Sequence, residues 1–515
     1  MTHNHTPDAT GRGRRRSRTR GLFTIGLLPA ALMIGTSTAN GAPIPSLPSP
    51  PGSDFLGTPA TARPLTDVPA TPQLAGLAPA GDAGIHNDGW MTDTYTRPGP
   101  LGHDTGVDSL LLGGECASLA FDRAGRIVTT CLGANTGLYL IDPATMRVLG
   151  SHPIPRRGLD AEAALAGSTD FSGGAYFYLD NHDRAVVGTG DGHVRVFAQT
   201  PSADGFTVEH DYDLTETLRA GETLNSVLPG TDGRMWFAAK TNGVVGILDP
   251  DTGAARTLRL GNGSDGQIQN SFAVGTDGEA YIATNRELFR LDPGPDAVPE
   301  ITWRVTYANS GQSKPGQVDD GTGTTPTVLP GGYVAITDNA DPMNVVVYRT
   351  DPAAQQREVC SVPVFSPGAS ATENTLIGAG RSLIVENNYG YAGPTATTFG
   401  KTTTAGFARV DINSGGDGCH LVWTNTTVAA PSVVPKLSLA TGLVYTYTKG
   451  TEPTDPWYWT ALDFRTGEMV WRRLAGSGPL YNNHYAGLAL GPDGAAYLGT
   501  LGGLIALRDR TGPNR

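Results

Sequence analysis

Carboxylate and amide side chains recur beside short apolar segments in the second half of the chain, and they are its clearest candidates for chemistry. Oxygen ligands of this kind suit Ca²⁺ rather than zinc, and a bound Ca²⁺ can polarise a carbonyl or quinone oxygen. If neighbouring repeats bring them together, they form a calcium site. The candidate metal ligands are Asp338, Glu373, Glu386 and Asn387.

Other polar and aromatic residues at equivalent places are candidates for catalysis and ligand binding. His484, beside two asparagines in a turn, is the candidate general base. Lysines could bind a carboxylate or sulfate, and tryptophans on a long loop could cover a ligand. Taken singly, a solvated lysine or a hydrogen-bonding histidine is the simpler interpretation. The candidate ligand-binding residues are Asn225, Asn270, Lys436, Lys449, Trp457 and Trp459.

Several catalytic motifs are missing from the sequence. It contains no GxSxG nucleophile elbow, no P-loop and no HExxH zinc motif. Its four cysteines form neither a CxxC pair nor a Cys/His cluster at zinc spacing. The sequence therefore leaves open whether the protein is an enzyme.

The even cysteine count indicates two disulfides, with three possible pairings. If residues 122–125 form a hairpin turn, Cys116 and Cys131 face each other on adjacent antiparallel strands, within disulfide reach. Cys360 and Cys419 then pair by elimination. Disulfides are typical of exported proteins.

Three segments divide the chain. Residues 1–42 combine six arginines with an apolar run and small residues, which predicts a removed secretion signal, with twin-arginine export as the alternative. Residues 43–85 are rich in Pro, Ala and Thr without apolar periodicity, which predicts a disordered spacer. Residues 86–515 form the folded body, and no stretch in them is long and apolar enough for a membrane span.

Charge narrows the range of partners. Removing residues 1–42, which hold six arginines and one aspartate, changes the formal net charge from −12 to −17. An acidic chain repels nucleic acid, so we expect a small molecule, a glycan or a protein as the ligand of a secreted, monomeric protein.

The folded body repeats itself with a period typical of β-propeller blades. Residues 230–253 and 275–296 share an apolar strand, an Asp-Gly turn, an alternating strand and a third strand ending in Asp. Thr231 and Thr276 mark a shift of 45 residues. Short strands at even spacing with Asp-Gly turns predict an all-β propeller, in which the polar candidates gather around one mouth of the central channel.

Eight innermost strands can be counted, although seven blades remains an alternative because residues 176–215 match the repeat poorly. The last blade lacks an outer strand, and residues 107–113 are placed to supply it, which would close the ring and remove two sheet edges. The predicted innermost strands begin near Cys116, Arg184, Asn225, Asn270, Thr327, Asn374, Lys436 and Tyr485.

The stretch "YWTALDFRTGEMVWRR" (458–473) resembles the repeat of quinoprotein-dehydrogenase-like propellers. That resemblance implies an eight-bladed fold; members include pyrroloquinoline-quinone dehydrogenases with Ca²⁺ and non-catalytic scaffolds. This chain lacks the adjacent cysteine pair of many such dehydrogenases. The strands "TDGRMWFA" and "TDGEAYIA" also resemble gluconolactonase-like and streptogramin-lyase-like propellers, which are metal-dependent enzymes; the matching positions are Asn225 and Asn270.

Three functions follow as alternatives. The first is a secreted propeller that binds a ligand or partner at one face of its channel without catalysis. The second is a Ca²⁺-dependent enzyme, such as a lactonase, lyase or hydrolase, acting on a small molecule or glycan. The third is a quinone-dependent dehydrogenase.

Overall fold

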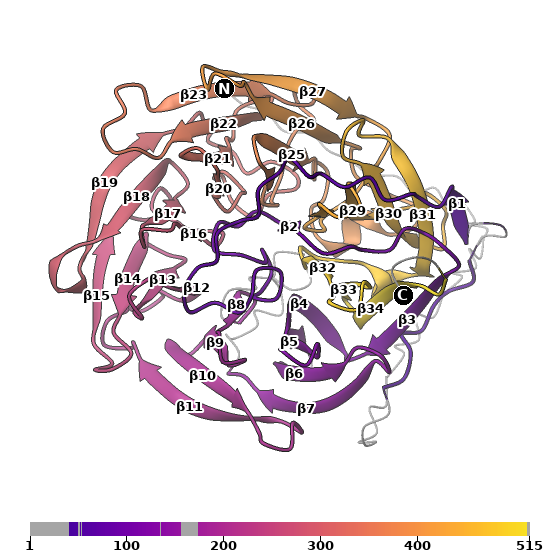
Figure 1. The fold of residues 1–515 in the computed structure, drawn as a ribbon, viewed down its shortest axis with the longest axis horizontal. Coiled ribbons are helices and arrows are strands. Elements are labelled where there is room, and N and C mark those ends of the chain that lie inside the picture. The colour runs from indigo at the N-terminus through magenta and orange to yellow at the C-terminus, as the bar shows by residue number, and fades with distance from the viewer. Residues whose placement is uncertain (1–40, 50–51, 53, 134, 156–173, 512–515) are drawn as a thin grey trace, which may run out of the picture. The chain divides into compact units, whose positions relative to one another are not determined.

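A computed structural model describes residues 41–49, 52, 54–133, 135–155 and 174–511. The chain divides after residue 38 into two units. The first unit lies wholly outside the described residues, as does nearly all of the predicted secretion signal. The second unit is a ring of eight four-stranded antiparallel blades, which confirms the predicted all-β propeller (Figure 1). Blades 1–8 are numbered in chain order.

Each blade starts at the channel and runs outward. The eight innermost strands are β4 (Gly114–Phe121), β8 (Phe177–Leu179), β12 (Leu224–Pro229), β16 (Ala273–Val274), β20 (Thr327–Leu329), β24 (Ile377–Ala379), β28 (Lys436–Ser438) and β32 (Leu488–Leu490). The second strands are β5 (Ile127–Gly133), β9 (Ala185–Gly188), β13 (Met235–Ala239), β17 (Ala280–Ala283), β21 (Tyr333–Thr337), β25 (Ser382–Glu386), β29 (Leu443–Lys449) and β33 (Ala496–Thr500).

The outer halves of the blades follow the same order. The third strands are β6 (Gly137–Asp142), β10 (His193–Gln199), β14 (Val244–Leu248), β18 (Glu287–Pro293), β22 (Asn344–Arg349), β26 (Phe407–Ile412), β30 (Pro456–Asp463) and β34 (Gly503–Asp509). The outermost strands are β7 (Arg147–Pro153), β11 (Phe206–Asp213), β15 (Ala255–Arg259), β19 (Pro299–Thr306), β23 (Glu358–Pro363), β27 (Cys419–Asn425), β31 (Met469–Ser477) and β3 (Thr105–Leu111).

Few elements lie outside the blades. Two short strands are β1 (Phe55–Gly57), which extends blade 7 beyond β31, and β2 (Thr94–Tyr95), which pairs in parallel with β28. Single turns of 3-10 helix are η1 (Pro295–Ala297), η2 (Pro394–Thr397) and η3 (Pro479–Tyr481). Within the described ranges, no helix is long and apolar enough to cross a membrane.

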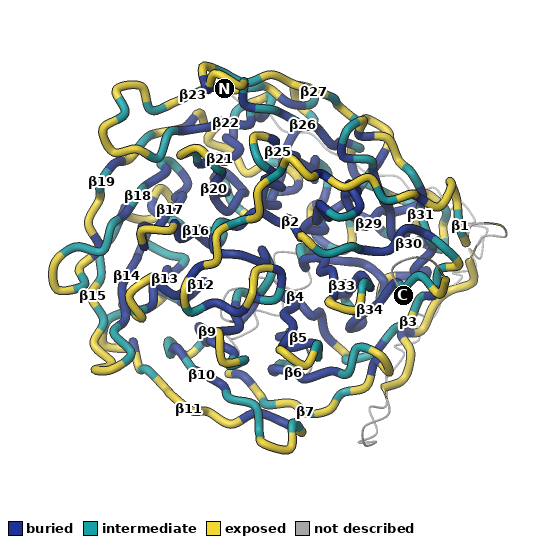
Figure 2. The backbone as a smooth tube through the Cα atoms, in the orientation of Figure 1, coloured by how far each residue is buried: buried dark blue, intermediate teal, exposed yellow. Residues whose placement is uncertain are grey.

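The inner three strands of most blades are buried on both faces because the neighbouring blades cover them (Figure 2). In blade 3, all residues of β13 and β14 are buried. Gly246 of β14 lies opposite Phe237 of β13, and a Cβ atom at Gly246 would come within 2.2 Å of the phenyl ring. A glycine is therefore required for the ring to lie flat against the neighbouring strand.

Ring closure follows the sequence prediction. The strand β3, from the start of the propeller, pairs antiparallel with β34 near the C-terminus, with Val107 opposite Leu507. It is therefore the outermost strand of blade 8, and the other three strands of that blade come from the C-terminal part of the chain. The exposed edges that an open three-stranded blade would leave are therefore paired.

The predicted innermost strand near Arg184 is wrong by one strand. In blade 2 the innermost strand is β8, and Arg184 lies in the turn between β8 and the second strand, β9. Most other blades place a glycine at the left-handed position of this turn, such as Gly233 with a φ of 87°. Blade 2 uses Asp183, with a φ of 61°, so the Asp-Gly signal is absent from the sequence.

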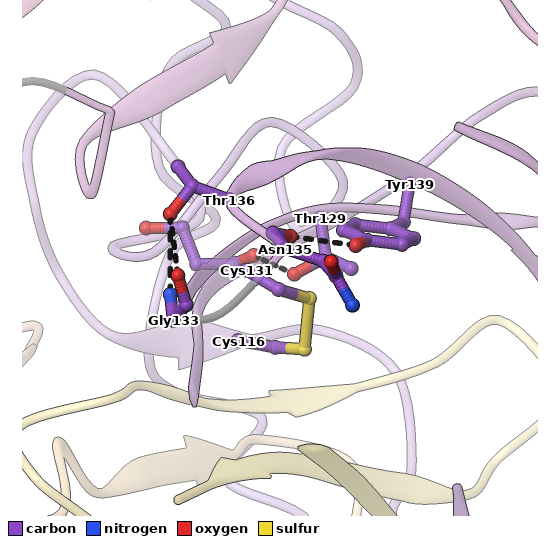
Figure 3. Close-up of a disulfide and its surroundings, with 8 residues drawn as sticks. Cys116, Thr129, Cys131, Gly133, Asn135, Thr136 and Tyr139 are labelled. Atoms are coloured by element: carbon purple, nitrogen blue, oxygen red, sulfur yellow. Dashed lines mark hydrogen bonds between the residues drawn. A yellow bond between two sulfur atoms is a disulfide. The ribbon is translucent and has the colours of Figure 1, made fainter. Parts of the chain in front are cut away.

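Both disulfides join strands as predicted. Cys116 of β4 lies opposite Cys131 of β5, and their Cα atoms are 3.9 Å apart (Figure 3). Cys360 of β23 is bonded to Cys419 of β27, which ties the outermost strands of blades 5 and 6 together across 59 residues.

Residues 43–85 differ from the predicted disordered spacer, because the described part of this segment packs along the propeller. Phe55–Gly57 forms β1, and Ile44, Leu65 and Leu77 are buried. The segment has no apolar period and cannot build a core of its own. Its apolar side chains instead pack into clusters built by residues of the propeller.

We define residues 82–95 as the channel segment; it crosses the middle of the ring (Figure 1). Its carbonyl groups accept hydrogen bonds from the innermost strands of six blades in chain order. The donor and acceptor pairs are Phe121–Asp82, Leu179–Ala83, Val274–Gly89, Val328–Trp90, Gly378–Thr92 and Leu437–Asp93, at 2.7–3.0 Å. The segment thereby closes the end of the channel at which the innermost strands finish.

Leu110 of β3 provides a test of ring closure, since it is fully buried although β3 is an outermost strand. We expect Leu110→Ala to lower the free energy of unfolding by about 2–5 kcal/mol, the cost of a buried leucine truncation. The matched control is Leu149→Ala in β7, whose side chain is 39% exposed, with an expected change within about 0.5 kcal/mol. Equal losses in denaturant titrations of the two variants would contradict closure by β3.

Candidate functional site in the central channel

A cavity of about 70 Å³ lies in the channel on top of the channel segment. All eight blades contribute a residue that lies in the first half of the innermost strand or precedes it, on the side predicted for one mouth of the channel. These are Ala117, Tyr176, Asn225, Asn270, Val318, Glu373, Val434 and Tyr485, in blade order. Ile85 and His86 of the channel segment also line it. Val318 is 40% exposed, so the cavity reaches solvent past this side chain.

Glu373 is the most unusual group in the cavity wall. It is 7% exposed, and its Oε2 accepts a hydrogen bond from the backbone N–H of Val318 at 3.1 Å. Its Oε1 is buried and has no partner among the described residues. Burial, reinforced by the nearby charge of Asp319, raises the pKa of Glu373 well above its usual range. A carboxyl group in this environment therefore keeps its proton to a higher pH than an exposed glutamate does.

His86 is held from below by a buried ion pair. Its Nδ1 lies 3.1 Å from Oδ1 of Asp93, and the ammonium group of Lys436 contacts the same carboxylate. Asp93 and Lys436 are both fully buried. Burial lowers the pKa of His86, so the ring is neutral and its Nδ1–H donates to Asp93.

The other nitrogen of His86 is left as an acceptor. His86 Nε2 lies 3.4 Å from the hydroxyl oxygens of both Thr325 and Thr375, at the lower end of the cavity. A histidine oriented through one nitrogen by a carboxylate, with the other facing a cavity, is a common arrangement for a general base.

Two tyrosines frame the space above His86. Tyr176 stacks on the imidazole, with ring centres 6.2 Å apart, and its hydroxyl donates to Oδ1 of Asn270 at 3.2 Å. Tyr485 has a φ of 61°, a left-handed conformation that bulky residues rarely adopt. Burial, reinforced by the nearby Glu373, raises the pKa values of both phenols. Strained backbone of this kind gathers at binding sites.

His484, the predicted general base, also lines the cavity. Its Nδ1 lies 3.0 Å from the hydroxyl of Tyr391, and its backbone N–H donates to Oε1 of Glu115 at 2.6 Å. Burial lowers the pKa of His484 to about 3. A ring with so low a pKa is a weak base at neutral pH.

The structure does not bring all six predicted ligand-binding residues to the cavity. Asn225 and Asn270 line it, and Nδ2 of Asn225 donates to the carbonyls of residues 268–270. Lys436 lies beneath it in the ion pair with Asp93. Lys449 is buried against Asp455, with 2.9 Å between Nζ and Oδ1.

Trp457 and Trp459 are not surface residues that cover a ligand. Each is 1% exposed, and both pack against Tyr447 in the core of blade 7. The reason is the alternation of β30, whose residues are covered on one side by blade 6 and on the other by blade 8. The loop after β25 does fold over this face, because Asp455 accepts hydrogen bonds from the backbone of Phe399 and Gly400.

The four predicted metal ligands are distributed over several environments. Asp338 accepts from the backbone and side chain of Asn344, and Glu386 accepts from Asn374 and Asn388. Asn387 bonds the backbone around Ala369 and Ala371, and only Glu373 lines the cavity. Across the described ranges, no three His, Cys, Asp or Glu side chains are grouped to hold a metal. Calcium binding stays a prediction.

A pyrroloquinoline quinone does not fit the channel. The cavity measures about 70 Å³, whereas pockets for ligands of that size measure about 300–1,000 Å³. Ile85 and His86 of the channel segment occupy the floor of the available space.

Sequence reasoning missed His86, Asp93 and Tyr176 as site residues. The first two lie in "IHNDGWMTDTY", where acidic and aromatic residues gather just after the proline-rich stretch, so a signal was present. Tyr176 precedes the short strand of blade 2, whose repeat is the most degenerate. Nothing in the sequence indicates that residues 82–95 return to the centre of the ring.

The comparisons with known proteins support the fold. No protein-family model matches the chain. An uncharacterised protein of Archaeoglobus fulgidus is 24% identical over 328 residues, which are 58% of this chain and 63% of that relative. The chain thus matches less than two thirds of the relative's length.

Comparison with solved structures supports the propeller fold. A europium-containing methanol dehydrogenase is similar with a TM-score of 0.53 and 12% identity, over 82% of this chain and 97% of that chain. A streptogramin B lyase structure has a TM-score of 0.42 and 12% identity, over 78% and 97% of the two chains. Together with the eight blades, the first of these confirms the predicted resemblance to quinoprotein-like propellers at the level of the fold.

The buried pair under the cavity generates one prediction. We expect Lys436→Met to lower the free energy of unfolding by about 3–5 kcal/mol, because it leaves the Asp93 carboxylate buried without its cation. The double variant Lys436→Met/Asp93→Asn should lose less free energy of unfolding than the two single variants lose when their losses are added. Arg63→Met, which breaks the surface pair with Asp463, should cost less than about 1 kcal/mol. If denaturant titrations give the same loss in free energy of unfolding for Lys436→Met and Arg63→Met, Lys436 is not the buried counter-ion of Asp93.

Asp88 of the channel segment generates a pH prediction. Burial raises its pKa from 3.8 to about 6, so between these values the folded state binds the proton more tightly than the unfolded chain. The stability due to this proton is complete below pH 4 and is lost as the pH rises through 6. Asp88→Asn keeps an oxygen for the Trp90 and Thr92 N–H groups. Between pH 4 and pH 7, the free energy of unfolding of the variant should rise by about 3 kcal/mol relative to that of the wild type. If the two free energies of unfolding change with pH in parallel, the prediction is wrong.

Proposed function

We propose that the protein is an exported propeller that binds a small polar molecule, or the polar end of a larger one, in the channel cavity. The observation that carries this proposal is Glu373, which lines the cavity and whose buried Oε1 has no partner in the described part of the chain. An unsatisfied buried oxygen costs about 1–3 kcal/mol, and a ligand that hydrogen-bonds it removes this cost.

Export is supported by covalent chemistry and charge. The described cysteines form two disulfides, which persist in oxidising compartments. The acidic net charge suits a protein that stays dispersed outside the cell. The predicted secretion signal of residues 1–42 agrees with both.

A second candidate function is acid–base catalysis on the bound molecule. The observation that favours it is His86, which Asp93 orients so that Nε2 faces the lower end of the cavity. Whether Ca²⁺ takes part in such a reaction is a separate question that metal analysis of the purified protein answers. A glycan or protein would enter only through its terminal groups, since the cavity is about 70 Å³.

Filling the cavity tests the proposed function. In a thermal-shift panel of small neutral, anionic and cationic compounds and CaCl₂, at least one compound should raise the melting temperature of the wild type. Ala117→Val adds two methyl groups inside the cavity wall and should abolish that shift.

The control variant is Ala353→Val, which places the same methyl groups on the exposed turn before β23 and should leave the shift unchanged. The proposal fails if no compound stabilises the wild type, or if Ala117→Val and wild type respond equally.

A further inference from the structure

Building on the proposed function, we propose that the channel cavity binds an organic ammonium group, with the Glu373 carboxylate as its counter-ion and the rings of Tyr176 and Tyr485 beside it. The wall of the cavity is acidic and aromatic, and its floor offers a nitrogen acceptor. That combination recognises a cation that also donates several hydrogen bonds.

The charges of the lining residues favour a cation over an anion. The described residues that line the cavity include one carboxyl group, two histidines and two tyrosines, but no lysine or arginine. Both histidines are neutral because burial lowers their pKa values. Lys436, which sequence reasoning assigns to anion binding, lies below the floor and is neutralised by Asp93. An anion would therefore find no lysine or arginine in the cavity lining, whereas a cation can pair with the Glu373 carboxylate.

An ammonium group has three N–H donors, and two acceptors belong to residues that line the cavity. Glu373 Oε1 is unpartnered in the described structure and more than nine-tenths buried with its side chain. His86 Nε2 is an acceptor because Nδ1–H is used by Asp93. An ammonium group would compete for it with the Thr325 and Thr375 hydroxyls at 3.4 Å. The faces of tyrosine rings attract cations by about 0.5–2 kcal/mol.

Size and ligand number distinguish an organic ammonium group from a metal ion. A volume of about 70 Å³ admits an ammonium group with a few carbon atoms, and a longer chain can leave past the exposed Val318. Ca²⁺ takes about six to eight oxygen ligands. The cavity has one carboxyl group, and Oδ1 of Asn270 already accepts from Tyr176.

Binding is coupled to a proton. Burial raises the pKa of Glu373, which favours the protonated form in the empty cavity, and an ammonium ion that enters favours the carboxylate. The exchange is balanced: one cation binds and one proton leaves to solvent. Five charged or titratable groups surround Glu373: Asp319, Lys240, Tyr176, Tyr485 and His86. We expect none of them to take up the proton that Glu373 releases, so this proton goes to solvent. Affinity should therefore rise with pH from 5 to 8.

Calorimetry with ethylammonium chloride tests this inference. At pH 7.5, ethylammonium should bind wild type and release up to one proton, read from the heats in two buffers of different ionisation enthalpy. Affinity at pH 8 should exceed that at pH 5 by at least tenfold. Ethanol, which has the same size without the charge, and sodium acetate should bind at least tenfold more weakly.

Glu373→Gln keeps the acceptor for the Val318 N–H and should weaken ethylammonium binding at least tenfold and abolish proton release. The matched control is Glu115→Gln. Glu115 is also a buried glutamate at the start of an innermost strand, with one partnered and one unpartnered oxygen, but it lies outside the cavity wall. Its variant should bind like wild type. If Glu373→Gln does not fold, proton release by the wild type decides the question.

The outcomes separate the two proposals. If CaCl₂ binds and displaces ethylammonium through Glu373, or if ethanol binds as tightly as ethylammonium, the ammonium assignment is overturned. If only neutral or anionic compounds bind, and Ala117→Val abolishes that binding, the proposed function stands and the ammonium assignment fails. If no compound binds, both fail.

Discussion

The channel segment is the interaction on which the rest of the structure depends. A ring of eight blades surrounds an axial space, and the ends of its innermost strands present N–H groups to it. Residues 82–95 fill one end of this space and supply carbonyl acceptors to six blades in turn. Buried backbone groups must be paired, so the segment is part of the fold rather than an appendage. By closing one end, it converts an open channel into a cavity with a floor.

The same segment determines the chemistry of the cavity. It brings His86 to the floor and Asp93 beneath it, where the carboxylate meets Lys436 of blade 7. This pairing removes the positive charge of Lys436 from the channel. What remains at the surface of the cavity is a carboxyl group, neutral imidazoles and phenols. The proposed preference for a cation thus depends on an ion pair that lies beneath the cavity.

Much of the fold could be predicted from the sequence because it depends on local pattern. Asp-Gly turns between alternating strands identified the blades, and where Asp183 replaces the turn glycine, the prediction for blade 2 was shifted by one strand. Hairpin geometry was sufficient to pair Cys116 with Cys131. Of the candidate site residues, Asn225, Asn270, Glu373 and His484 line one cavity, and their function stays a prediction. Trp457 and Lys449 were misplaced, because burial between blades is not visible in a single strand.

By itself, then, the sequence determined the repeated blade, the closure of the ring by residues 107–113 and the cysteine pairs, since each depends on spacing along the chain. Only the tertiary structure decided where the proline-rich segment goes and what faces the channel. The path of residues 43–95 depends on gaps and unpaired N–H groups that exist only after the blades have assembled. For the same reason, a lysine in an innermost strand became a buried counter-ion, and a histidine outside the repeats became the floor of the cavity.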